Sequence, residues 1–360
     1  MNMPFRVAFV GVDHPHGAGW RESLANLEAE VQIAALVPRF GGTTFSLEER
    51  HCQVPRFQTV EQLLSDGRDL FDGAIICLPN DECPDAVVDL ANAGKHVLVE
   101  KPGAASVAAG QKIVEAVRKS RVAFQSGYLW RYDAGANRLR DMVRDGRFGQ
   151  LISIETSFVT SDVARRGAQH YLFDSSVSGR GFFNWLACHW IDLLLYVTCQ
   201  DVVGITARTG SFGASATDVE DGGAAIFDLA GGGLATFIGG YWLPRWAGEA
   251  NWTVRGSQRW VHWDPMRSGT GGVLTIHGPQ PQFQAMNETF SIPADAVPGY
   301  GGSRCVDLLR DWIGAAKERR DCRNTPESAL AVLKILDGIY ESSATGCRLE
   351  MGMNGMKDAT

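Results

Sequence analysis

The stretch His96-Val97-Leu98-Val99-Glu100-Lys101-Pro102-Gly103 decides the fold class. Its apolar run is typical of a strand that is buried on both faces of a parallel sheet. The carboxyl ends of parallel strands form the edge at which open α/β sheets bind their ligands. We therefore expect Glu100 and Lys101 to lie near a bound ligand; the alternative is a surface lysine in a turn.

The pattern around this stretch predicts two domains. Apolar strands alternate with helical patterns up to about residue 126, which predicts an α/β domain with a doubly wound parallel sheet over residues 1–126. Strands of period two separated by glycine-rich turns then predict an α+β domain with a mostly antiparallel sheet over residues 127–350. Residues 351–360 are expected to be a loose tail. The expected strands lie at 5–10, 31–37, 71–78, 96–100, 122–125, 151–158, 202–208, 223–228, 233–239, 251–255 and 260–263, and the main expected helices at 83–93, 107–119, 136–144, 184–196, 304–317 and 325–342.

Composition excludes several classes of protein. The 360 residues carry 34 Lys and Arg against 41 Asp and Glu, a net charge of −7, which argues against non-specific nucleic-acid binding. No charge-free run of about 18 apolar residues is present, and the amino terminus lacks the layout of a signal peptide. Eight scattered cysteines without a C-x-x-C pair suit reduced thiols. We expect a cytoplasmic protein with no nucleic-acid or membrane partner.

The turn after the first strand reads Val10-Gly11-Val12-Asp13-His14-Pro15-His16-Gly17. Only Gly11 fits the dinucleotide fingerprint G-x-G-x-x-G, because Asp13 and His16 stand at the other two glycine positions. A carboxylate at Asp13 would repel a diphosphate unless it capped the following helix. The turn is either an altered cofactor site, with Gly11, Asp13, His14 and His16 as cofactor-binding residues, or a plain βα turn. The spacing of His14, His16 and His189 is poor for ligands, so no metal is expected.

The second strand ends in Val37-Pro38-Arg39 and lacks the acid that usually binds the ribose 2′-hydroxyl of NAD. An arginine at this position suits a 2′-phosphate. Of the two cofactors, NADP is therefore favoured over NAD, with Arg39 as a cofactor-binding residue; a solvated Arg39 is the alternative.

Several segments together resemble the Gfo/Idh/MocA family of nicotinamide-dependent oxidoreductases. The resemblance implies a Rossmann domain followed by a domain with a large open sheet, often used for dimer or tetramer contacts, so a homodimer or homotetramer is expected. The matching segments are LPN at 78–80, AGKHV at 93–97, EKP at 100–102, GYLWRYD at 127–133, HWID at 189–192, TPESA at 325–329 and SATG at 343–346.

The same resemblance implies roles for residues. Lys101 would be the catalytic lysine, Glu100 its neighbour at the cofactor, and Leu78, Pro79 and Asn80 would line the nicotinamide side. Tyr128 and Arg131 would help to shape the substrate pocket. The implied activity is hydride transfer between NAD(P) and a carbinol or ketone carbon of a sugar, inositol or polyol derivative. The alternative within the family is a redox-neutral enzyme that oxidises a sugar transiently to allow cleavage or epimerisation.

The sequence departs from the family at its second catalytic segment, D-x-x-x-H. The histidine is His189, but Trp185 stands at the aspartate position, and residues four apart share a helix face. Either His189 still acts as a general acid or base with Lys101, while Asn184 and Trp185 contact the substrate, or the protein only binds a nucleotide or sugar. The polar stretch 161–181, with Arg165 and Arg166, is either a specificity loop or a surface loop.

Overall fold

The computed structural model describes residues 3–14, 17–42, 53–213, 217–278 and 287–352. The chain divides into two compact units. Unit 1 comprises Met1–Tyr132 and Ala296–Leu333, and unit 2 comprises Asp133–Asp295 and Lys334–Thr360. Each unit is described by itself.

Unit 1 is built on a five-stranded parallel sheet, as the apolar strands predicted. The strand order is β2-β1-β3-β4-β5, and Val7 of β1 pairs with Ile33 of β2 on one side and with Gly73 of β3 on the other. The sheet is buried on both faces because almost every residue of β1, β3 and β4 is apolar. The strands are β1 (Phe5–Val10), β2 (Val31–Val37), β3 (Gly73–Ile76), β4 (His96–Val99) and β5 (Phe124–Ser126).

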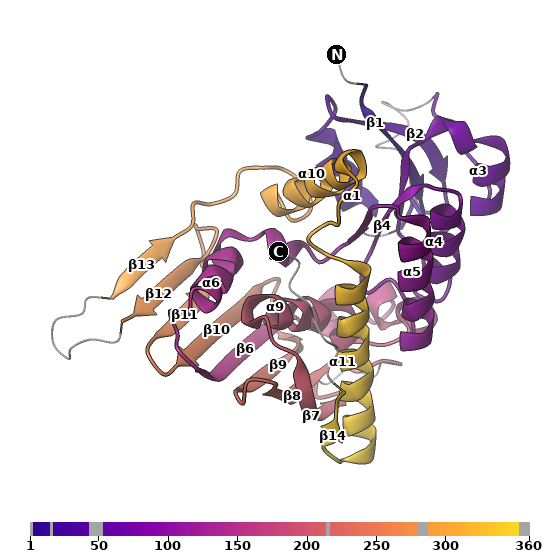
Figure 1. Ribbon diagram of the computed structural model, residues 1–360. Helices are drawn as coiled ribbons and strands as arrows, with labels where there is room; N and C mark the ends of the chain where they lie inside the picture. The colour runs from indigo at the N-terminus through magenta and orange to yellow at the C-terminus, as the bar shows by residue number, and fades with distance from the viewer. Residues whose placement is uncertain (1–2, 15–16, 43–52, 214–216, 279–286, 353–360) are drawn as a thin grey trace. The chain divides into compact units, whose positions relative to one another are not determined.

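Helices connect these strands and cover the sheet. Helices α4 and α5 lie side by side (Figure 1). Serine and threonine caps fix two helix starts: Ser106 Oγ accepts from Ala109 N at 3.2 Å, and Thr59 Oγ1 accepts from Gln62 N at 3.1 Å. The helices are α1 (Gly17–Ala25), α3 (Val60–Asp66), α4 (Cys83–Asn92) and α5 (Val107–Ser120).

Helix α10 (Ser303–Glu318) also belongs to unit 1. Its apolar stripe joins the core cluster of the parallel sheet, where the Trp312 ring packs edge-on against Phe5 at 5.2 Å. The compact units thus differ from the predicted division, which assigned this helix to residues 127–350. An amphipathic stripe shows that a helix is packed, but not which core it joins.

Unit 2 contains a nine-stranded sheet in the order β13-β12-β11-β10-β6-β9-β8-β7-β14. All of its pairs are antiparallel except β6 with β9, which confirms the mostly antiparallel sheet expected from the sequence. The short strands β12, β13 and β14 were not predicted. The strands are β6 (Leu151–Ser161), β7 (Val202–Gly210), β8 (Gly222–Leu229), β9 (Leu234–Leu243), β10 (Gly248–Gly256), β11 (Trp260–Asp264), β12 (Val273–His277), β13 (Glu288–Ser291) and β14 (Leu349–Glu350).

One face of this sheet is covered by helices α6 (Ala134–Arg144) and α9 (Cys188–Thr198) (Figure 1). Trp190 of α9 packs on Trp252 at 6.0 Å between ring centroids, and Trp252 packs on Trp263 at 5.8 Å. Helix α11 (Pro326–Thr345) starts in unit 1 and continues into unit 2 from Lys334. Among the described residues, no helix is long and apolar enough to cross a membrane.

Candidate active site

The turn after β1 passes close to the end of β3. Gly11 has a φ of +70°, and an added Cβ there would overlap the carbonyl oxygen of Cys77, so only glycine fits. Its N–H donates to Val37 O at 2.7 Å. His14 is buried, and its ring packs edge-on against Phe40 at 4.9 Å. The predicted cofactor residue His16 lies outside the described residues.

Asp13, at the second glycine position of the fingerprint, contacts the loop that follows β2. Its buried carboxylate accepts three backbone N–H groups from the loop after β2: Arg39 at 2.7 Å, Phe40 at 2.8 Å and Gly42 at 3.2 Å. These donors satisfy the charge and fix the loop against the turn. Asp13, which stands in place of a glycine of the fingerprint, thus connects the loops after β1 and β2 at the carboxyl edge of the sheet.

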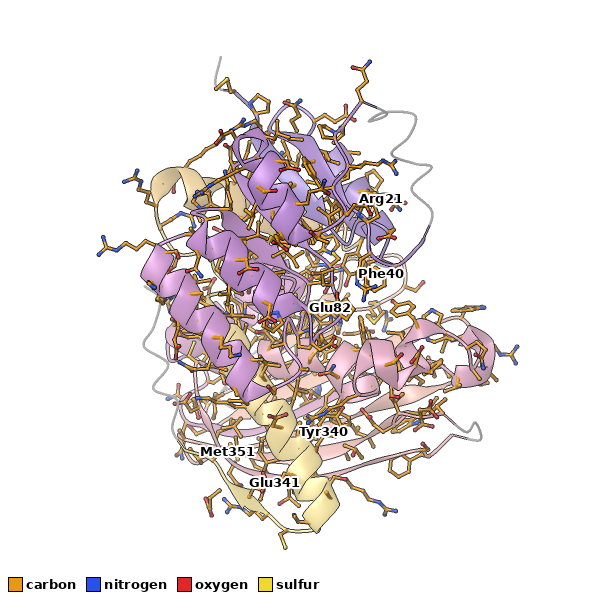
Figure 2. The ribbon with its side chains drawn as sticks, turned by 90° about the vertical axis from the view of Figure 1, so that its right-hand side faces the viewer. Arg21, Phe40, Glu82, Tyr340, Glu341 and Met351 are labelled. Carbon is orange, nitrogen blue, oxygen red and sulfur yellow. The ribbon has the colours of Figure 1, made fainter. Side chains whose placement is uncertain are left out.

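Arg39 lies on that same loop and forms a two-point ion pair with Glu82, at the start of α4. Arg39 Nε lies 2.8 Å from Glu82 Oε2, and Nη2 lies 2.5 Å from Oε1. Figure 2 labels Phe40 and Glu82, which lie on the two loops that this ion pair joins. A cavity of about 270 Å³ beside the loop is lined by Asp13, Pro38, Arg39, Gly41, Gly42 and Arg56.

At the end of β4, Lys101 is only 2% exposed, so it is not a surface lysine. The buried Glu100 carboxylate accepts from Lys101 N at 2.6 Å through Oε2, and from the indole N–H of Trp20 at 3.1 Å through Oε1. Trp20 lies on α1 and was missed by the sequence analysis. A hydrogen bond between residues 80 positions apart leaves no local signal in the sequence.

Two buried donors at the same sheet edge have no partner among the described residues: Asn80 Nδ2, after β3, and Ser126 Oγ, at the end of β5. An unmade hydrogen bond to a buried polar atom costs about 1–3 kcal/mol, so such donors suit a ligand. Leu78 and Pro79 precede Asn80, and Pro79 O accepts from Glu82 N at 3.0 Å. These donors fit the hydroxyl, phosphate and amide groups of a nicotinamide dinucleotide.

The segment after β5 is held by the chain beyond α10. Arg131 Nη1 donates to Arg323 O at 3.1 Å, Arg323 Nη1 donates to Arg131 O at 2.6 Å, and Asn324 Nδ2 donates to Ser126 O at 2.8 Å. Tyr128 is fully buried in the same segment. Arg131 therefore stabilises unit 1, and the roles of Tyr128 and Arg131 in substrate binding stay predictions.

In unit 2, the predicted helix around His189 begins with one widened turn. Residues Phe183–Ala187 form a π-helical turn before α9, a feature frequently found at functional sites. Trp185 and His189 are both buried, and the Trp185 ring meets the Tyr171 ring edge-on at 5.5 Å. Asn184 Nδ2 donates to Ser178 O at 3.1 Å, which ties the turn to the preceding segment.

Glu220, missed by the sequence analysis, fixes the start of this π-helical turn. Its carboxylate accepts from Gly181 N at 2.8 Å, from Phe183 N at 3.1 Å and from the Tyr340 hydroxyl at 2.6 Å. Tyr340 lies on α11 (Figure 2). Burial raises the pKa of Glu220 above its ordinary value, although all three donors act in the opposite direction.

The stretch 161–181 is partly structured rather than an open loop. It contains the short helices Val163–Arg166, Tyr171–Phe173 and Ser175–Ser178. The Arg166 guanidinium lies 5.3 Å from the centre of the Tyr241 ring and donates to Thr160 Oγ1 at 3.1 Å, so it already has partners. Whether this stretch sets specificity stays a prediction.

Lys101 lies in unit 1 and His189 in unit 2. In the part of the chain that the structure describes, no group of three or more His, Cys, Asp or Glu side chains is arranged to hold a metal ion. The candidate site residues are therefore a buried lysine beside a fixed carboxylate, donors at a sheet edge without a partner among the described residues, and a buried histidine on a helix.

Three of the relatives and solved structures that resemble the chain are dehydrogenases. Inositol 2-dehydrogenase of Salmonella paratyphi B is 25% identical over 183 residues, 50% of this chain and 52% of the relative. Glucose-6-phosphate 3-dehydrogenase of Bacillus subtilis is 26% identical over 153 residues, 42% of this chain and 43% of the relative. The chain spans about half the length of these curated relatives. The structure of levoglucosan dehydrogenase in complex with NADH and L-sorbose covers 97% of this chain and 99% of its own, with a TM-score of 0.85 at 15% identity.

Two family models match the chain, and together they cover more than half of it. Residues 5–128 match the model of the oxidoreductase family with an NAD-binding Rossmann fold, and residues 136–262 match the model of the GFO/IDH/MocA C-terminal domain. The two matches follow the same order as unit 1 and the sheet of unit 2. The chain therefore belongs to the Gfo/Idh/MocA family of oxidoreductases.

Proposed function

We propose that the chain is an NAD(P)-dependent dehydrogenase or reductase that acts on a CH–OH group of a sugar, inositol or polyol derivative. The observation that carries this proposal is Lys101, a buried lysine at the carboxyl edge of a Rossmann sheet beside a carboxylate held by two donors. The bound nicotinamide would supply or accept the hydride. The Lys101 ammonium would hold the substrate hydroxyl and take part in moving its proton. The donors of Asn80 and Ser126 would bind the cofactor.

His189 is the second proton-transfer group in this proposal. An imidazole has an ordinary pKa near 6.5, which suits proton transfer at neutral pH. Trp185 stands where the family carries a carboxylate, and with Tyr171 it offers aromatic surface on which a sugar ring could stack. Asn184 supports the π-helical turn that carries Trp185 and leads into the helix of His189.

Within this proposal NADP is the favoured cofactor. The support is the cavity of about 270 Å³ after β2, which has two guanidinium groups, Arg39 and Arg56, in its lining. Among the described residues of that lining, the one carboxylate is that of Asp13, which is already satisfied by three backbone N–H groups. Titration calorimetry with NAD, NADH, NADP and NADPH tests the preference, and failure of all four to bind would overturn the enzymatic proposal.

The variant Lys101→Met tests the proposed function. It keeps the apolar stem and removes the ammonium, so turnover should fall by about 100-fold or more while cofactor affinity stays within about twofold. Lys112→Met, at an exposed position of α5, is the matched control and should behave as wild type. Turnover is measured from the absorbance of the reduced nicotinamide on a panel of cyclitols, sugars and sugar phosphates. Full activity of Lys101→Met would refute the assignment.

We also propose that the protein is a cytoplasmic homodimer or homotetramer that pairs through the face of the nine-stranded sheet opposite α6 and α9. Ile238 pairs with Ala224 and Leu234 with Asp228, so Ile226, Leu234 and Ile238 share this face, and each is more than two-fifths exposed. A cavity of about 620 Å³ reaches the same surface at Ile238 and Trp242. Ile238→Asp should dissociate the oligomer in light scattering, whereas Ile292→Asp, away from these strands, should not.

Free thiols at the seven described cysteines support a reducing compartment.

A further inference from the structure

The indole of Trp20 connects the cofactor turn to the proposed catalytic lysine. Trp20 is fully buried on α1, the helix that follows the β1 turn, and its Nε1 lies 3.1 Å from Glu100 Oε1. The other carboxylate oxygen accepts from the backbone N–H of Lys101 at 2.6 Å. The backbone of Gly127 closes a third side, since an added Cβ there would lie 3.2 Å from Glu100 Oε2. The carboxylate is thus confined between α1, the end of β4 and the end of β5.

The surroundings of Glu100 make these donors important. Trp20 belongs to a core cluster that also contains Phe9, Cys77 and Cys305, so the carboxylate borders apolar side chains and thiols. Burial, with a further contribution from the charge of Glu100, raises the pKa of Cys83 and of Cys305 to about 12 and that of Cys77 well above its ordinary value. These thiols therefore stay neutral. A buried carboxylate in such a setting depends on its hydrogen-bond donors.

We propose that Trp20 is a positioning residue that fixes the Glu100 carboxylate and thereby the backbone from which Lys101 projects. This inference rests on the proposed function, because it takes Lys101 as the catalytic lysine. A phenylalanine or leucine would fill this core position equally well, but neither has a group that can donate a hydrogen bond to the carboxylate. The indole N–H of tryptophan can do so. The contact also gives α1 a second role: it carries the cofactor turn at one end and orients the lysine through its side chain.

The test compares Trp20→Phe with Trp312→Phe. Both tryptophans are fully buried in the same core cluster, but Trp312 Nε1 has no hydrogen-bond partner among the described residues. The two variants therefore lose similar volume, and only Trp20→Phe loses a hydrogen bond to a carboxylate. For Trp20→Phe we expect kcat to fall about tenfold, KM for the cofactor to stay within about twofold, and the acid limb of the pH profile to move to higher pH. Trp312→Phe should change none of these.

A second measurement does not require turnover. Because the indole N–H stabilises the charged carboxylate, the loss of melting temperature in Trp20→Phe should shrink as the pH is lowered and Glu100 becomes protonated. The loss in Trp312→Phe should not vary with pH. Glu100→Gln provides the double-mutant cycle, in which Trp20→Phe should cost less stability than it does in the wild-type background.

The outcomes separate the inference from the proposed function. If Trp20→Phe matches Trp312→Phe in kcat, pH profile and the pH dependence of melting, the inference is overturned while the proposed function stands. If the wild-type protein shows no nicotinamide-linked turnover, the proposed function fails, and Trp20 has no catalytic lysine to position. Should Trp20→Phe fail to fold, additive effects of Trp20→His and Glu100→Gln on melting would overturn the inference, and coupled effects would support it.

Discussion

Lys101 and His189, the two proposed proton-transfer residues, have different surroundings. Each residue is a buried basic group at the start or end of a regular element, but Lys101 follows Glu100, whose carboxylate is held by Trp20 and by a backbone N–H. Near His189, the family's carboxylate position is occupied by Trp185, which packs on Tyr171. A carboxylate thus stands directly beside Lys101 in the sequence, whereas four residues before His189 an aromatic ring replaces the usual carboxylate.

The largest expected effect is that of changing His189, which tests whether the histidine works without a carboxylate four residues earlier. If the histidine moves a proton without help from an aspartate at position 185, His189→Gln should lower kcat about 100-fold, because a general acid or base typically contributes at least that much. Cofactor affinity should stay unchanged, since the expected cofactor residues lie in unit 1. Steady-state kinetics and calorimetry measure the two quantities.

The matched control is Trp185→Phe, which keeps an aromatic ring against Tyr171 and should change kcat by less than about threefold. A His189→Gln variant with wild-type turnover would show that unit 2 supplies no proton-transfer group. Unit 2 would then contribute only binding surface.

A smaller effect is expected at Glu220, the buried carboxylate that supports the His189 region. Its raised pKa means that the folded protein binds this proton more tightly than the unfolded chain does. The free energy of unfolding should therefore fall as the pH rises from the ordinary glutamate range, near 4.3, through the raised pKa. Glu220→Gln removes the titrating group, so this decline should disappear.

Urea denaturation at a series of pH values measures this difference. Glu341→Gln, at an exposed position of the same α11 that carries Tyr340 (Figure 2), is the control and should keep the wild-type slope. An unchanged slope in Glu220→Gln would mean that another group causes the decline.

These two regions also show how far the sequence predicts the molecule. The five strands of the parallel sheet, six of the nine strands of the second sheet and the place of Lys101 at a strand end followed from local patterns: apolar runs, period-two alternation and a strand that ends in Glu-Lys-Pro. The residues that hold the site through long-range contacts did not follow from local patterns. Trp20 and Glu220 contact residues far away in the chain, and α10 joins a core that its own amphipathic stripe does not identify. Asp13 replaces a glycine of the fingerprint, and the sequence did not indicate that three N–H groups of the loop after β2 would donate to it.

The smallest expected effect concerns the choice of cofactor. Arg39 is paired with Glu82, and a 2′-phosphate would have to compete with that carboxylate for the guanidinium. Both side chains are more than a third exposed, and ion pairs of this kind contribute at most about 1 kcal/mol. Glu82→Gln should therefore tighten NADP binding by up to about fivefold and leave NAD binding nearly unchanged. Glu61→Gln, on α3, controls for the loss of one negative charge. Equal gains for NAD and NADP in calorimetry would indicate a general charge effect, and would place the discriminating contact at Arg56 or elsewhere in the cavity rather than at Arg39.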